Sequence, residues 1–85
     1  MHELLGMKTF NKKTFLSRLG AFLFRLRKSK GMSQDRLTDE AGLAKGLVSK
    51  IESGNVDPRT TTLVQLAHAL EIPPSKMLEA DKKSA

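Results

Sequence analysis

The sequence contains no cysteine, no tryptophan and no tyrosine. Without cysteine there is no disulfide framework and no thiolate metal site, and nothing in the composition demands an oxidising compartment. No apolar run approaches the roughly 20 residues that a membrane span requires, and the N-terminal MHELLGMKTF lacks the apolar core of a signal peptide. We therefore expect a cytoplasmic protein with no membrane partner.

Residue patterns typical of catalysis are also missing. The two histidines, His2 and His68, stand in no metal-ligand spacing and in no nucleophile–base arrangement. The glycines are scattered along the chain and do not form a phosphate-binding loop followed by a lysine. We therefore expect no enzyme activity, no cofactor and no metal site.

Positive charge is the main feature of the composition. The 85 residues include 15 Lys and Arg against 9 Asp and Glu, which gives a net charge of +6 and a pI near 10.0. Between Lys8 and Lys30 there are eight basic residues and no acidic one, whereas basic and acidic side chains balance over residues 60–85. This distribution favours a polyanionic partner for the N-terminal third of the chain.

The segment from Ser33 to Gly54 predicts two short helices joined by a glycine turn. Ser33 is a suitable N-cap, Asp35 suits the positive end of the helix dipole, and Gly42 can take the left-handed conformation that ends a helix. The second helix should bury Leu43, Val48 and Ile51 and expose Lys45, Gly46, Ser49 and Lys50. Two helices fixed at a steep angle can present one of them to a DNA groove.

Three further helical segments flank this pair. The first, from residue 14 or 15 to about Lys28, has an apolar face made of Phe15, Leu19, Phe22, Leu23 and Leu26. The fourth begins at a Thr60 cap and has a buried stripe of Leu63, Leu66, Ala67 and Leu70. The fifth covers residues 75–79 after Pro73-Pro74, and its Met77 and Leu78 should close the core.

These elements predict an all-α, compact five-helix domain over residues 14–80. Residues 1–13 form a basic N-terminal arm in this interpretation, and residues 81–85 form a frayed C-terminal tail.

The spacing of Ser33-Gln34, Leu37, Gly42, Val48-Ser49, Ile51-Glu52 and Gly54 resembles the helix-turn-helix of the lambda-repressor and Cro-like regulators, the XRE family. The resemblance extends from about Leu19 to Leu78. It implies a lambda-repressor-like DNA-binding domain, with the helix-turn-helix at its second and third helices. Three positions depart from the family. Phe22 and Phe24 replace polar or basic residues, and Thr38 replaces the alanine that is usual between helices two and three.

The resemblance also implies roles for individual residues. Base contacts fall on the third helix, at Lys45, Gly46, Ser49 and Lys50. The lysines can donate to guanine and Ser49 to several bases, whereas Gly46 can only permit close approach. The N-terminus of the second helix, with Ser33 and Gln34, offers a neutral anion site for phosphate. Matching family positions add phosphate contacts at Ser53, Asn55 and Arg59.

Arg27 and Glu52 occupy positions that form a structural ion pair in the repressor-like fold. The exposed Phe24 needs a separate explanation. We expect it to be covered by the N-terminal arm, through Leu4, Leu5 or Phe10, or by a second subunit.

The first functional hypothesis is a transcriptional regulator, a repressor or autoregulator, that binds double-stranded DNA at a near-palindromic operator as a homodimer. The alternative is an antitoxin that uses the same fold to bind DNA and caps a toxin protein. A third hypothesis is a protein-interaction adaptor that no longer binds DNA, which the two lysines of the third helix disfavour.

Overall fold

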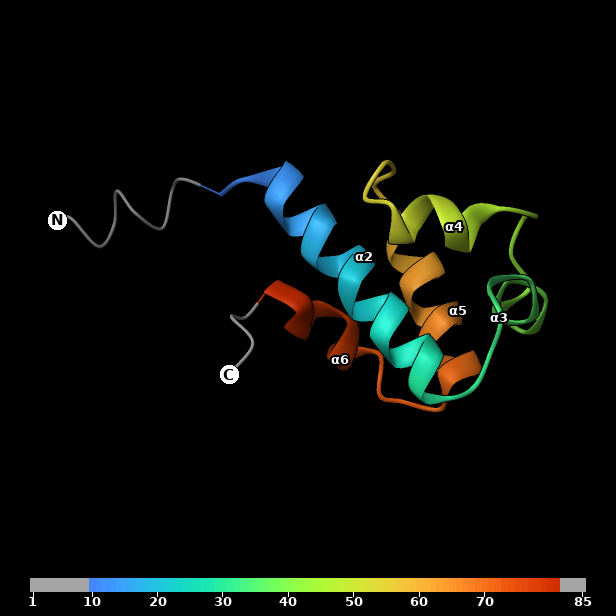
Figure 1. Ribbon diagram of the computed structural model, residues 1–85. Coiled ribbons are helices and arrows are strands. Elements are labelled where there is room, and N and C mark those ends of the chain that lie inside the picture. Colours follow the sequence, from blue (N-terminus) through green and yellow to red (C-terminus); the bar gives the residue numbers. More distant parts are fainter. Residues whose placement is uncertain (1–9, 82–85) are drawn as a thin grey trace, which may run out of the picture.

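The computed structural model describes residues 10–81, which form five α-helices and one short 3-10 helix (Figure 1). The helices are α2 (Lys12–Ser29), α3 (Gln34–Ala41), α4 (Leu47–Glu52), α5 (Thr60–Leu70) and α6 (Ser75–Leu78), followed by η1 (Glu79–Asp81). The described residues include no strand, so the predicted all-α, five-helix class is confirmed. None of these helices has both the length and the apolar character needed to cross a membrane.

Helix α2 begins earlier than the sequence pattern predicted. Its N-cap is Asn11, whose side-chain Oδ1 accepts a hydrogen bond of 2.9 Å from the backbone N–H of Thr14. The predicted start at residue 14 or 15 is therefore wrong, because the apolar face begins only after the cap and one turn of polar residues. Residues 11–13, predicted as part of the arm, therefore belong to α2 and its N-cap, and residues 1–9 lie outside the described residues.

The long helix α2 is packed between the other elements, with α4 on one side and α6 and η1 on the other (Figure 1). The contact with α4 is close at Gly20. A Cβ atom at this position would lie 2.5 Å from the carbonyl oxygen of Ile51 and 2.6 Å from that of Glu52. Glycine is therefore required here by the approach of α4 and not by the local conformation of α2.

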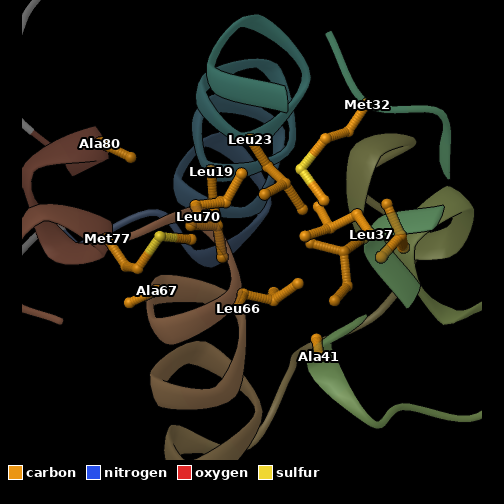
Figure 2. Close-up of a cluster of buried hydrophobic side chains, with 12 residues drawn as sticks. Leu19, Leu23, Met32, Leu37, Ala41, Leu66, Ala67, Leu70, Met77 and Ala80 are labelled. Carbon is orange, nitrogen blue, oxygen red and sulfur yellow. The ribbon is translucent and has the colours of Figure 1, made fainter. Parts of the chain in front are cut away.

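The core lies where the helices α2, α3, α4, α5 and α6 meet (Figure 2). Its fully buried large side chains are Leu19, Leu23, Leu37, Val48, Ile51, Leu66, Leu70 and Met77. The expected burial of Leu19, Leu23, Val48, Ile51, Leu66, Leu70 and Met77 is confirmed. Leu78 was also predicted to close the core, and this is wrong: it is 61% exposed, while Ala80 of η1 is buried. The short α6 turns only one of its two consecutive apolar residues inward.

Two helix ends differ from the predictions. The N-cap of α5 is Arg59, whose side chain makes no capping hydrogen bond, so Thr60 is the first helical residue and not the cap. The helical conformation continues through Asp81, where the Arg18 guanidinium donates a hydrogen bond of 3.4 Å to the backbone carbonyl. Asp81, predicted as the first residue of the tail, is therefore part of η1, and the other residues of the predicted tail, 82–85, lie outside the described residues.

Candidate nucleic-acid interface

The turn between α3 and α4 has the predicted local chemistry. The Ser33 hydroxyl caps α3 by accepting a hydrogen bond of 3.0 Å from the backbone N–H of Arg36. Gly42 ends α3 with a φ of 71°, and the N–H of Leu43 donates to the carbonyl of Thr38. The helix therefore stops where a residue without Cβ can turn the chain towards α4.

Thr38 fits the interface between α3 and α4 without an unsatisfied hydroxyl. Its side chain is buried, and its Oγ1 donates a hydrogen bond of 2.7 Å to the carbonyl of Gln34, one turn earlier in α3. Because this bond remains within α3, the hydroxyl that Thr38 adds in place of the family's alanine needs no hydrogen-bond partner from α4.

Helix α4 is shorter than predicted at its N-terminus. Leu43, Lys45 and Gly46 were expected on the helix, but α4 begins at Leu47 and all three residues precede it. Leu43 is half-buried and not fully buried as predicted, while Lys45 and Gly46 lie in the turn directly before the helix. Gly46 is the N-cap and has a φ of 83°, a conformation that other L-residues rarely adopt, while a Cβ there would meet no atom within 4 Å. The left-handed backbone conformation of the turn is therefore enough to explain why position 46 is a glycine, without any close approach to DNA.

The side chains of α4 separate into a buried and an exposed side as predicted. Val48 and Ile51 are buried, whereas Ser49 and Lys50 are exposed. Lys45 is exposed in the turn that leads into the helix. Leu47, the first residue of α4, is half-buried and packs against the core. The structure therefore leaves three polar side chains available for base contacts, one from the turn and two from α4.

The loop after α4 holds the remaining predicted phosphate contacts. Ser53, Asn55 and Arg59 are all exposed. The Ser53 hydroxyl donates a hydrogen bond of 2.8 Å to the carbonyl of Lys50, and the backbone N–H of Asn55 donates to the same carbonyl. These bonds hold the start of the loop against the C-terminus of α4.

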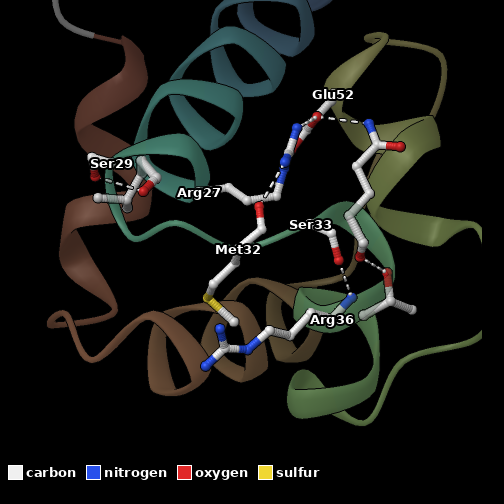
Figure 3. Close-up of polar contacts among 9 residues, drawn as sticks. Arg27, Ser29, Met32, Ser33, Arg36 and Glu52 are labelled. Atoms are coloured by element: carbon white, nitrogen blue, oxygen red, sulfur yellow. Dashed lines mark hydrogen bonds and ion pairs between the residues drawn. The ribbon is translucent and has the colours of Figure 1, made fainter.

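The predicted ion pair between Arg27 and Glu52 is present (Figure 3). The Arg27 guanidinium donates from Nε to Oε2 at 2.6 Å and from Nη2 to Oε1 at 3.0 Å, and its Nη1 donates to the Met32 carbonyl at 2.8 Å. Hydrogen bonding to Glu52 raises the pKa of the Arg27 guanidinium above its ordinary value, although burial opposes this change. The pair thus joins α2, α4 and the chain before α3.

Gln34 extends this network. Its side-chain Nε2 donates a hydrogen bond of 2.9 Å to Oε1 of Glu52. Sequence reasoning assigned Gln34 to phosphate binding and did not predict this bond, because the two residues are 18 positions apart and only the packing of α3 on α4 brings them together. The amide retains a second N–H and a carbonyl oxygen for other partners.

An open cavity of about 650 Å³ lies between the C-terminal end of α2 and the start of α3. It is lined by Arg27, Lys28, Gly31, Met32, Ser33, Gln34 and Asp35. Ser33 and Gln34, the two phosphate candidates at the start of α3, are thus neighbours on one hollow surface. Sequence reasoning did not place Lys28 at this surface, because the residue belongs to another helix.

Phe24 is 46% exposed on α2, next to the ion pair. The Arg27 guanidinium carbon lies 5.4 Å from the centroid of its ring and the Lys28 ammonium 6.0 Å from it, which are distances typical of cation–π contacts. Phe10, one of the predicted covers, packs against Phe15 at 5.9 Å between ring centroids. The other two predicted covers, Leu4 and Leu5, lie outside the described residues.

Comparison with known proteins agrees with this geometry. A family model described as Helix-turn-helix matches residues 23–77. An uncharacterized HTH-type transcriptional regulator of Sinorhizobium fredii, y4dJ, is 33% identical over 54 residues, which make up 64% of this chain and 70% of that protein.

Two solved structures have the same fold. The restriction-modification controller protein C.AhdI from Aeromonas hydrophila superposes with a TM-score of 0.71 and 34% identity, over 73% of this chain and 94% of that one. An HTH_3 family transcriptional regulator from Vibrio cholerae gives a TM-score of 0.76 and 32% identity, over 84% of this chain and 40% of that one. The resemblance noted in the sequence is confirmed: the chain belongs to the helix-turn-helix (XRE) family of DNA-binding transcriptional regulators.

Proposed function

We propose that this protein is a sequence-specific transcriptional regulator, a repressor or autoregulator, that binds a near-palindromic operator as a homodimer. The observation that supports this most directly is the exposure of Lys45 in the turn before α4 and of Ser49 and Lys50 on α4. These side chains donate hydrogen bonds, and Ser49 also accepts them, so they can distinguish base pairs in the major groove.

The dimer follows from the size of the unit. Helix α4 has 6 residues, and a single module of this size contacts few base pairs. Two copies related by a two-fold axis would place two α4 helices in successive major grooves, about 34–36 Å apart. We place the protein in the cytoplasm, together with the DNA that it regulates, and assign it no catalytic role.

The phosphate contacts are part of the same proposal. Ser33 and Gln34 lie at the start of α3, and Ser53, Asn55 and Arg59 lie in the loop after α4, so they would bind the DNA backbone on either side of the recognition helix. Such contacts set the position of the protein on the duplex and supply much of the affinity, but they do not read sequence directly.

Selection of bound duplexes from a random-sequence pool tests this function. Competitor DNA and about 150 mM salt suppress purely electrostatic binding. We expect enrichment of a palindrome whose half-sites are one helical turn apart. Enrichment of a single half-site would contradict the dimer. Failure to enrich any sequence would contradict sequence-specific regulation and would favour a role in binding a protein such as a toxin.

A further inference from the structure

The charged residues that line the cavity at the start of α3 come from α2 as well as from the helix-turn-helix. Two of its lining residues, Arg27 and Lys28, are basic and one, Asp35, is acidic. The charge of Arg27 is already balanced, because both oxygens of Glu52 accept hydrogen bonds from its guanidinium. An anion that enters the cavity would therefore gain little from the charge of Arg27.

The other groups at this cavity are neutral donors or an acid. Ser33 and Gln34 contribute backbone N–H groups at the positive end of the α3 dipole, and Gln34 adds one amide N–H that Glu52 does not use. Asp35 repels an anion. Without Lys28, the balanced Arg27 and the Asp35 carboxylate would leave the lining with a net negative charge, which is unfavourable for a phosphate.

Lys28 can supply the positive charge that an anion in this cavity would need. It is exposed, lines the cavity and pairs with no carboxylate of residues 10–81. Its ammonium also lies 6.0 Å from the centroid of the ring of Phe24, the aromatic side chain that departs from the family pattern.

We infer that Lys28 is a further phosphate-contacting residue, and that the DNA strand bound at the start of α3 also passes the C-terminal end of α2. The inference rests on the proposed function. The uncompensated charge comes from α2, while the start of α3 supplies uncharged donors.

The test is the salt dependence of binding to the selected duplex, measured for the wild-type protein, Lys28→Gln and Arg25→Gln. Arg25→Gln is the matched control because it also removes one positive charge. Arg25 is exposed on the same helix but does not line the cavity. Thermal unfolding checks that both variants are folded, as expected for exposed positions.

Loss of one phosphate contact reduces the slope of log affinity against log salt by about 0.9. We therefore expect the affinity deficit of Lys28→Gln to shrink about 3.5-fold between about 50 and 200 mM salt, whereas Arg25→Gln keeps the wild-type slope. Lys28→Arg should restore the slope. Equal slopes for Lys28→Gln and Arg25→Gln, with wild-type binding intact, would overturn this inference alone. Absence of wild-type binding to any duplex would overturn the proposed function as well.

Discussion

The Arg27 guanidinium and the Glu52 carboxylate form a two-bonded ion pair whose side chains are only 7% and 5% exposed. The pair connects the C-terminal end of α2 to the last residue of α4, and Gln34 binds the same carboxylate from the start of α3. One carboxylate therefore fixes both helices of the helix-turn-helix against the long helix that supports them.

Removing that carboxylate should be costly. We expect Glu52→Ala to lower the free energy of unfolding by about 3–5 kcal/mol, because it leaves a buried guanidinium without its counter-charge. Urea denaturation measures the change. Glu40→Ala is the control, since it breaks the exposed Arg36–Glu40 pair and should cost at most about 1 kcal/mol. Similar losses for the two variants would contradict the structural role of the buried pair.

Gly20→Ala should destabilise the protein although alanine is the better helix former. The new methyl group would lie 2.5 Å from the Ile51 carbonyl oxygen, and such overpacking typically costs about 1–3 kcal/mol. Ser17→Ala, at an exposed position of the same helix, should have little effect. Both changes can be measured by urea denaturation. A gain in stability for Gly20→Ala would mean that α2 and α4 are further apart than the structure shows.

Gly46→Ala tests why a glycine precedes α4. We expect a loss of about 1–2 kcal/mol in the free energy of unfolding, because Gly46 has a φ of 83° and alanine adopts this conformation poorly. Gly46→Asn should cost less, since asparagine tolerates left-handed backbone. Unchanged stability together with impaired DNA binding would instead support the predicted close approach of this residue to DNA.

Glu71→Gly should stabilise the protein. Glu71 ends α5 with a φ of 60° and is the one residue other than glycine with positive φ among the described residues. Glycine removes a conformational cost of about 1 kcal/mol at this position. Glu71→Ala separates charge from conformation, because it removes the carboxylate but keeps the strained backbone. If the two variants raise the melting temperature equally, the stabilisation comes from removal of the charge and not from relief of the backbone.

Lys50→Ala and Gln34→Ala should have opposite effects on specificity. If Lys50 reads a base, its removal reduces discrimination between the selected and a random duplex by about 1–3 kcal/mol. If Gln34 contacts phosphate, its removal weakens binding to both duplexes alike. Competition binding measures both. If Lys50→Ala weakens binding equally to the selected and the random duplex, Lys50 contacts the DNA phosphate backbone and not a base. The stability of Gln34→Ala needs a parallel measurement, because Gln34 also binds Glu52.

Several features could be predicted because their causes lie within one helical turn. The Ser33 cap and the left-handed Gly42 depend on neighbouring backbone groups, and both are present as expected. The buried Leu19, Leu23 and Leu66 follow from the period of the helix. The missed start of α2 at Asn11 and the missed turn at Gly46 also involve local signals, but each residue type is compatible with more than one backbone conformation.

The sequence by itself determined the helical class, the turn between α3 and α4 and the exposed lysines, because caps, glycines and periodicity act over a few residues. Only the tertiary structure decided that Gln34 binds Glu52, that α4 requires a glycine at position 20, and that Lys28 lines the cavity at the start of α3. These relationships join residues on different helices. They depend on how each helix is rotated and how closely it packs, which no local pattern specifies.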